Sequence, residues 1–249
     1  MSVKMFYDNM VSYLRKNNGC WENVYLISSL LQNDDNFHYR YSLDDDDNID
    51  GFIGMWEDEK AVTMTGNVDY CMDFYESNKD KYTFYDINEN VSSKIMGKYS
   101  NKDTNLKSTK YHVMNMDSSG FSCDVCDSDY EAISRDSWES IRDEYLNKHN
   151  IKFTSYCDDK MEWYVSRNEN GEVVSNLCFE KVMDDMYILT NFYSSPEVKG
   201  HGIGRKLFKS LMNQHDRKLV LFVKKDNPIV DFYEEIGFNR VASTWSFDI

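Results

Sequence analysis

The apolar residues of this chain recur with two different periods, which predict a mixture of helices and strands. In the first half, apolar positions three or four residues apart predict helices at 3–16, 21–32 and 68–78. Alternating or continuous apolar runs bounded by turn residues predict strands at 37–42, 50–56 and 60–65. This half of the chain is therefore expected to be a mixed α/β unit.

The second half shows the same mixture with more regular strands. Strands are expected near 120–125, 161–168, 173–182 and 185–193, and helices near 128–134 and 136–149. Residues 168–171 (Asn-Glu-Asn-Gly) separate two of these strands, and because Asn and Gly tolerate positive φ they predict a hairpin turn. Three antiparallel strands are therefore expected before residue 194.

A polar, turn-rich stretch lies between the two halves, at about residues 98–117, and contains one short apolar strand. Stretches of this kind are typical of domain boundaries. We therefore expect a smaller N-terminal α/β domain at 1–115 and a second domain at 116–249. The predicted fold class is α/β, with a mixed and mostly antiparallel sheet.

From Met186 onward the elements follow the order strand, loop, helix, strand, helix, strand. Residues 219–223 form a continuous apolar run, which is typical of a strand covered on both faces. Ile203, Leu207 and Leu211 recur at helical spacing and predict an amphipathic helix that starts at a glycine-rich loop. The helix is therefore expected to connect two parallel strands.

Charge and composition restrict the class of protein. The formal net charge of −15 disfavours nucleic acid or an anionic membrane as a partner, because both would be repelled. The same charge favours a cationic substrate, or it serves only to keep the surface soluble. No apolar run is long enough to span a membrane and no signal peptide is recognisable, so a cytoplasmic location is expected.

The six cysteines lack the density of a disulfide framework, so reduced thiols are expected. Cys123 and Cys126 form an isolated CxxC, for which zinc or redox chemistry is the alternative. A structural zinc site would need a second cysteine pair or a spaced histidine pair. We find neither in the sequence, and no metal is therefore expected.

The glycine-rich loop at 199–205 (Lys-Gly-His-Gly-Ile-Gly-Arg) has the features of an anion-binding site. Its glycines let a phosphate approach the backbone, and the following helix supplies unpaired N–H donors and a favourable dipole. Lys199, Arg205, Lys206 and Lys209 surround it with positive charge. The alternative is an ordinary tight turn before a helix. A dinucleotide-binding loop is disfavoured by the antiparallel strands before it, and a Walker loop by Gly204-Arg205-Lys206.

This loop resembles the acyl-CoA-binding signature of the GNAT acetyltransferase superfamily, whose glycine part matches Gly202-Ile203-Gly204. Lys199 stands where the family usually has Arg or Gln, so the charge is kept and the planar fork is lost. A second resemblance lies at 227–238. Here Asn227 is expected to end a strand, and three residues separate Phe232-Tyr233 from Gly237-Phe238. The resemblance extends over about 120–249 in the order of elements, and its motifs occupy 192–238.

The resemblance implies acetyl-CoA as the cosubstrate and assigns roles to individual residues. Tyr233 would be the general acid that protonates the departing CoA thiolate, although a half-buried core tyrosine is the alternative. Backbone groups of the fourth core strand would hold pantetheine and polarise the thioester carbonyl. The implied cofactor-binding residues are Phe192, Tyr193, Ser194, Lys199, Gly200, His201, Gly202, Ile203, Gly204, Arg205, Asn227 and Phe232.

The implied reaction is direct attack by a primary amine of a small molecule or protein on acetyl-CoA in a ternary complex. An amine must lose a proton first, so a base is needed. Glu180 is the first candidate and Glu162 the second, and each could equally be a surface carboxylate. For His201 a spacer or anion-contact role is favoured.

Two questions stay open in the sequence. The alternative to an enzyme is a non-catalytic acyl-CoA sensor or interaction module. Residues 1–115 could be a degenerate copy of the same fold, because some family members are tandem. The protein is expected to be a monomer or a homodimer.

Overall fold

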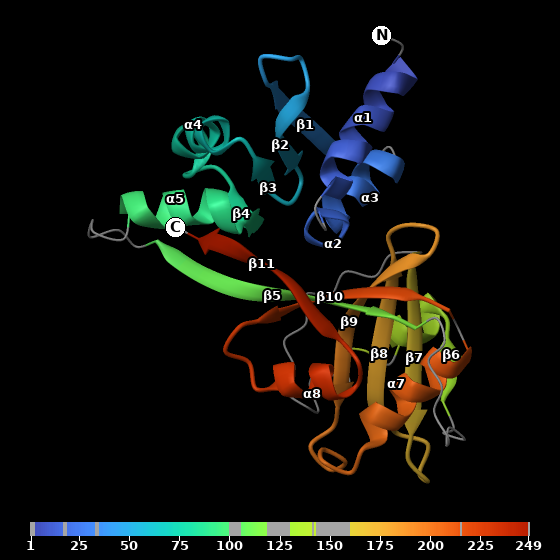
Figure 1. The fold of residues 1–249 in the computed structure, drawn as a ribbon. Helices are drawn as coiled ribbons and strands as arrows, with labels where there is room; N and C mark the ends of the chain where they lie inside the picture. The colour runs from blue at the N-terminus through green and yellow to red at the C-terminus, as the bar shows by residue number, and fades with distance from the viewer. Residues whose placement is uncertain are drawn as a thin grey trace. The chain divides into compact units, whose positions relative to one another are not determined.

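The computed structural model describes residues 3–16, 19–32, 35–99, 106–118, 130–140, 142, 160–214 and 216–248 (Figure 1). The chain forms two compact units, each built from separate stretches of sequence. Unit 1 comprises Met1–Met114, Phe222–Val230 and Asn239–Ile249, and unit 2 comprises Asn115–Leu221 and Asp231–Phe238. The division into domains at 1–115 and 116–249 stays a prediction.

Unit 1 is a sheet covered by helices. Its elements are α1 (Val3–Arg15), α2 (Gly19–Glu22), α3 (Val24–Gln32), β1 (Phe37–Leu43), β2 (Ile49–Trp56), β3 (Ala61–Gly66), α4 (Val68–Asn78), β4 (Thr83–Asn88), α5 (Glu89–Tyr99), most of β5 (Lys107–Asp117) and β11 (Asn239–Asp248). The strand order is β1-β2-β3-β4-β11-β5. The six helices and strands predicted up to residue 78 are confirmed, whereas β4 and α5 were missed.

Unit 2 contains β6 (Glu131–Ile133), β7 (Met161–Arg167), β8 (Val173–Lys181), β9 (Met186–Ser194), α7 (Ile203–Gln214), the first residues of β10 (Lys218–Lys224) and most of α8 (Ile229–Glu235). Its strand order is β10-β9-β8-β7-β6. The neighbours β7, β8 and β9 are antiparallel, whereas β9 and β10 are parallel. These pairings confirm the predicted mixed α/β sheet and the parallel crossover through α7.

The predicted helix at 128–134 is wrong for residues 131–133. These residues form the strand β6, in which Glu131 pairs with Val165 and Ile133 with Trp163 of β7. Pairing with a neighbouring strand outweighs the local helical pattern in so short a segment. The helix expected at 136–149 is confirmed at 135–140 and 142, and its other residues, with the strand expected at 120–125, lie outside the described residues.

Each unit has its own apolar core. In unit 1, α4 and α5 pack on the sheet around buried residues such as Ile53, Tyr75, Phe84 and Phe247. In unit 2, Trp138 stacks on Trp163 with ring centroids 4.2 Å apart, and both indoles are buried. A stacked pair of this kind contributes roughly 1 kcal/mol beyond the area it buries.

The two units share one structural motif, a helix that joins two parallel strands. In unit 1, β3 pairs with β4 at Ala61↔Thr83 and Val62↔Phe84, and α4 connects the two strands. In unit 2, the pairing of β9 with β10 starts at Met186↔Lys218. Among the described residues, each parallel pair has only a few paired positions, although all four strands extend beyond them. The motif therefore occurs twice in the chain.

The junction between strand and helix differs between the two motifs. In unit 1 only Asn67 separates β3 from α4, and its side chain caps the helix by accepting a hydrogen bond from Tyr70 N (3.0 Å). The other end of this amide, Nδ2, donates to the Asp50 carboxylate at 2.6 Å. The amino terminus of α4 is therefore occupied by groups of the protein itself.

Further hydrogen bonds join β3 to β4 beyond their short register. Thr63 Oγ1 donates to the Tyr85 carbonyl at 2.9 Å, and Asn88 Nδ2 donates to Thr65 Oγ1 at 2.9 Å. These side chains link the two strands where their backbones no longer pair. In unit 1 the end of the parallel pair is therefore bridged.

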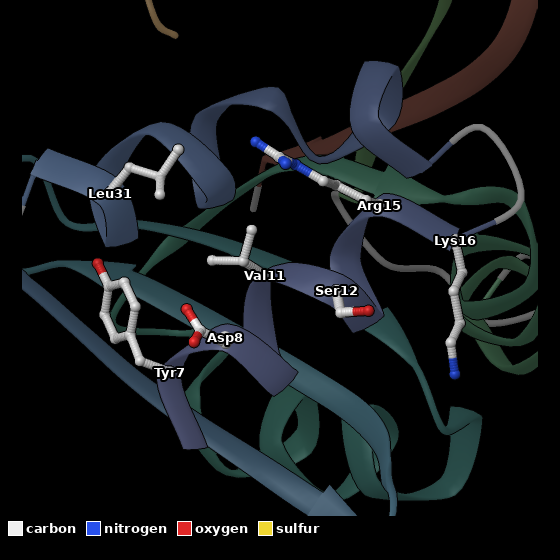
Figure 2. Close-up of a pocket in the computed structure, with 7 residues that line it drawn as sticks. All are labelled: Tyr7, Asp8, Val11, Ser12, Arg15, Lys16 and Leu31. Atoms are coloured by element: carbon white, nitrogen blue, oxygen red, sulfur yellow. The ribbon is translucent and has the colours of Figure 1, made fainter. Parts of the chain in front are cut away.

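Unit 1 also has a surface cleft of about 490 Å³, which Figure 2 shows. It is lined by Tyr7, Asp8, Val11, Ser12, Arg15 and Lys16 from the α1 side and by Leu31 from α3. None of these lining residues belongs to the predicted site. Within the described part of the chain, no helix has the length and apolar character needed to cross a membrane.

Candidate functional site

Strand β9 has a bulge at the start of the predicted cofactor residues 192–194. Asn176 of β8 pairs with Tyr193, and Cys178 pairs with Thr190, so two residues of β9 face the single residue between them on β8. Asn191, one of the two, has φ of 49°. Bulges of this kind bend a strand and redirect its backbone groups. The bulge therefore determines where residues 192–194 point.

The loop between β9 and α7 has the conformation that its glycines predict. Gly200 and Gly202 have φ values of 85° and 76°, which side-chain-bearing residues rarely adopt. A Cβ atom at either glycine would meet no atom within 4 Å. The glycines are therefore needed for backbone conformation, and the space beside them is open.

Helix α7 begins with unpaired backbone donors. Its first helical hydrogen bond runs from Lys206 N to the Gly202 carbonyl at 2.9 Å. The amides of Ile203, Gly204 and Arg205 precede this bond and have no helical acceptor. They lie at the positive end of the helix dipole, so the arrangement suits a bound anion.

Gly204 has a different role, because it allows α7 to pack closely on β9. A Cβ atom at this position would lie 2.7 Å from Ser194 Oγ and 3.2 Å from the Phe192 ring. Ser194 Oγ is itself within 2.9 Å of Ser175 Oγ. The helix therefore reaches the predicted site segment only because residue 204 is glycine.

An aromatic cluster joins β9, α7 and α8 in unit 2. The ring of Phe192 lies 5.6 Å from Phe232, 6.1 Å from Phe208 and 6.5 Å from Tyr233. Tyr233 also contacts Phe238 at 5.7 Å. The structure thus brings together three predicted site residues, Phe192, Phe232 and Tyr233.

Tyr233 is buried, with 9% of its surface exposed. Burial raises the pKa of Tyr233 to about 12, because the phenolate would lose its hydration. Its hydroxyl therefore carries a proton at neutral pH, as a hydrogen-bond donor must.

The predicted cationic residues differ in their surroundings. Arg205 forms an ion pair with Glu235 of α8, and its guanidinium lies 5.6 Å from the Phe232 ring centroid. Lys199 and His201 are exposed on the loop, and His201 N donates to the Val198 carbonyl at 3.1 Å. Arg205 therefore links α7 to α8, whereas Lys199 extends toward solvent.

Asn227 lies in unit 1, just before α8, and is exposed. Its Oδ1 accepts a hydrogen bond from Ile229 N at 3.1 Å, and its carbonyl accepts one from Val230 N at 3.1 Å. Asn227 therefore caps the start of α8.

Glu180 lies on β8, three residues after Leu177, the residue that faces the bulge. It pairs with Ile188, which is four residues before Phe192 on β9. At about 3.3 Å per residue, this separation is roughly 13 Å along the strand. The structure does not bring Glu180 together with Phe192 and Tyr233.

The second candidate base, Glu162, belongs to an ion pair. Arg217 Nη2 donates to its carboxylate at 2.7 Å, and Tyr164 OH donates at 3.0 Å. Arg217 is buried, and its guanidinium carbon lies 4.7 Å and 4.5 Å from the ring centroids of Phe179 and Tyr187. These contacts explain Glu162 as a partner of a buried arginine.

The sequence analysis missed the bulge and the side chain that contacts it. Asn191 was part of a predicted strand, and Asn176 had no assigned role, although Asn176 Nδ2 donates to the Asn191 carbonyl at 2.6 Å. The one signal in the sequence was the asparagine at 191, because Asn adopts positive φ more readily than most residues. A single asparagine inside an apolar strand is a weak signal, and the pairing partner fixes the bulge.

We expect Gly204→Ala to lower the free energy of unfolding by about 1–3 kcal/mol, because the new methyl group would overlap Ser194 and Phe192. Chemical denaturation measures this change. Gly97→Ala is the matched control, since Gly97 lies in α5 and a Cβ atom there would meet no atom within 4 Å, and it should stabilise the protein by roughly 0.5–1 kcal/mol. Equal stability of Gly204→Ala and the wild type would contradict the close packing.

Comparison with known proteins is consistent with this geometry. The model of the family described as "Acetyltransferase (GNAT) family" matches residues 128–238. No curated protein matches the chain.

Three solved structures share the fold over nearly the whole chain. A Drosophila protein has a TM-score of 0.64 and 11% identity, and the match covers 99% of this chain and 96% of that one. A GCN5-related N-acetyltransferase-like protein from Streptococcus suis has a TM-score of 0.59 and 11% identity, with 97% and 99% covered. A tandem GNAT protein from the clavulanic acid biosynthesis pathway has a TM-score of 0.58 and 9% identity, with 99% and 94% covered.

These identities are low enough that the solved structures support the fold alone. The family match supplies the assignment for the second half, where the glycine loop, α7 and Tyr233 lie. The C-terminal half of this chain is therefore a GNAT acetyltransferase domain, within a fold like that of tandem GNAT proteins.

Proposed function

We propose that the C-terminal domain transfers an acetyl group from acetyl-CoA to a primary amine of a small molecule or protein. The observation that carries the proposal is the row of unpaired amides at the start of α7, next to glycines with positive φ and open space. Such a row binds the oxygens of a diphosphate. The family match to this half supports the same ligand.

The diphosphate of CoA would accept hydrogen bonds from the amides of Ile203, Gly204 and Arg205. Lys199 and His201 lie on the same loop and would add charge or contact at its rim. The Arg205 side chain already forms an ion pair with Glu235, so we expect it to hold α8 against α7. The backbone N–H of Arg205 would then bind the diphosphate. Because the protein as a whole is negatively charged, an anionic ligand such as CoA would need this local positive region in order to approach.

The pantetheine arm would run along Phe192, Tyr193 and Ser194, from the bulge of β9 onward. An N–H group there would donate to the thioester carbonyl and stabilise the oxyanion that forms on attack. Phe232 would line the arm from α8. A role for Asn227 in binding CoA stays a prediction from the family motif. These assignments follow the family motif residue by residue.

In the reaction, the amine nitrogen forms a bond to the acetyl carbon, the carbon–sulfur bond breaks, and the sulfur keeps the electron pair. The amine loses a proton and the thiolate gains one, so the products are an N-acetylamine and CoA thiol. Tyr233 would donate to the departing sulfur. Its pKa of about 12 exceeds the value of about 8.5 for a thiol, so we expect a hydrogen bond that stabilises the thiolate before the proton is transferred.

We propose that water, rather than a side chain, accepts the proton that the amine loses. Glu180, the first candidate, lies roughly 13 Å along the sheet from Phe192, which is too far for direct contact. Glu162 is held by Arg217. A cationic amine that loses its proton to solvent before attack needs no buried carboxylate, and the acidic surface would attract it.

Unit 1 would contribute no second cofactor site. At the start of α4, the single residue Asn67 and the Asp50 carboxylate occupy the place of an anion, and side chains bridge β3 to β4. A diphosphate would have to displace these contacts and approach a carboxylate. We therefore infer that unit 1 is a copy of the fold without the ligand.

The protein, incubated with acetyl-CoA and a panel of polyamines, aminoglycosides and peptides, should release CoA thiol with at least one amine.

Tyr233→Phe should lower kcat about 10- to 100-fold while changing the dissociation constant of CoA less than threefold, because the hydroxyl acts on the leaving sulfur. Thiol release and calorimetry measure the two quantities.

Tight CoA binding without thiol release from any amine would favour the alternative, a non-catalytic acyl-CoA sensor or interaction module. Equal loss of kcat and CoA affinity in Tyr233→Phe would remove the acid role while leaving the reaction in place.

Native mass spectrometry should detect one CoA per chain, because the described junction between β3 and α4 in unit 1 has no glycine loop. Gly202→Asp should reduce this to none, since the carboxylate would repel the diphosphate and φ of 76° disfavours a side chain. Two CoA molecules per chain, or one retained by Gly202→Asp, would contradict the assignment.

A further inference from the structure

One buried side chain in unit 2 contacts the bulge of β9. Asn176 lies on β8 with none of its surface exposed, and its Nδ2 donates to the carbonyl of Asn191 at 2.6 Å. This carbonyl belongs to the bulged segment, where the regular pairing of β8 and β9 is interrupted. Asn176 therefore supplies a donor at the point where the ladder is disrupted.

The contact holds a backbone conformation that departs from a regular strand. Asn191 has φ of 49°, in the left-handed region that asparagine enters more readily than most side-chain-bearing residues. The bulge also places two residues of β9, Asn191 and Phe192, opposite Leu177 alone. The hydrogen bond from Asn176 therefore holds the backbone where the regular ladder is interrupted.

Stability alone does not account for an asparagine at position 176. Its Oδ1 is buried and has no hydrogen-bond partner within the described structure. A buried acceptor left in this state costs about 1–3 kcal/mol. The neighbours Leu177, Cys178 and Val165 are buried and apolar, so an apolar residue would avoid this cost.

The bulge and the unsatisfied acceptor thus meet at one side chain, where residues 192–194 begin. We propose that Asn176 is a positioning residue for the acetyl transfer: it holds the bulge that aims the backbone of Phe192, Tyr193 and Ser194 at the thioester. This inference rests on the proposed function. Asn176 acts through Asn191 and has no contact with the substrate in this account.

The chemical consequence follows from the geometry of carbonyl polarisation. A backbone N–H stabilises an oxyanion only when it lies close to hydrogen-bond distance from the oxygen. A displacement of about 1 Å can cost roughly 100-fold in rate. Loss of the hydrogen bond from Asn176 to the Asn191 carbonyl would let β9 return toward regular pairing with β8. The backbone N–H groups of residues 192–194 would then move away from the thioester.

The test compares Asn176→Leu, which keeps a similar size without a donor, with the wild type. The dissociation constants of acetyl-CoA and of CoA are both measured by calorimetry, together with kcat. We expect kcat to fall about 100-fold, because the displaced donors act on the oxyanion. Acetyl-CoA binding should weaken about tenfold and CoA binding less than threefold, since only the first ligand carries the thioester. Asn176→Asp, which cannot donate when ionised, should act in the same direction and serves if the leucine variant does not fold.

Asn23 of unit 1 provides a matched control. It is also a buried asparagine, and its Nδ2 donates to the Leu14 carbonyl at 3.1 Å. Asn23→Leu removes the same kind of hydrogen bond, so it should lower the unfolding temperature without changing the ratio of the two dissociation constants. A purely structural role for Asn176 predicts the same behaviour for both variants.

The outcomes separate this inference from the proposed function. An unchanged ratio of dissociation constants in Asn176→Leu overturns the positioning role, even if the wild type turns over amines. A changed ratio supports the role even where no tested amine is acetylated. A wild-type protein that binds neither ligand removes both proposals.

Discussion

The close packing of helix α7 on strand β9 is the constraint on which the candidate site depends. Gly204 makes the approach feasible, because any Cβ atom there would overlap Ser194 Oγ and the Phe192 ring. The approach brings the unpaired amides of the helix beside the bulged end of the strand. The aromatic cluster around Phe192 and the ion pair of Arg205 with Glu235 then hold α8, and Tyr233 with it, against the same helix.

The same crossover of strand, helix and strand occurs in both units, yet the described junctions between strand and helix differ. In unit 2 a loop with two positive-φ glycines leads into α7. In unit 1 the loop is reduced to Asn67, which caps α4 and is hydrogen-bonded to Asp50. A helix amino terminus needs partners for its donors. In unit 1 the Asn67 side chain caps α4, whereas in unit 2 the amides of residues 203–205 are the donors that we propose for the diphosphate.

Local patterns in the sequence predicted the parts of the fold that depend on neighbouring residues. The glycine loop, the helix after it and the Phe-Tyr motif of α8 are encoded within short segments, and the structure has each element at its predicted place. The hairpin at 168–171 was likewise predictable, since Gly171 adopts φ of 81°. The GNAT resemblance rested on these local signals and is confirmed for the C-terminal half.

Features that depend on distant partners could not be predicted in this way. Residues 131–133 form a strand because β7 offers them a pairing edge, and the bulge at Asn191 exists because β8 pairs on both sides of it. Glu162 could be interpreted as a base until its ion pair with Arg217, 55 residues away, was seen. The distance of Glu180 from Phe192 follows from the strand register, which the sequence alone does not specify.

Binding of the CoA diphosphate by the amides at the start of α7 can be measured by titrating isotope-labelled protein with CoA and following the amide signals by NMR. We expect large shifts for the amides of residues 202–205, saturating at one equivalent, with little change at 67–70 in unit 1. Shifts that leave residues 202–205 unaffected, or no binding at millimolar CoA, would contradict this mode of binding.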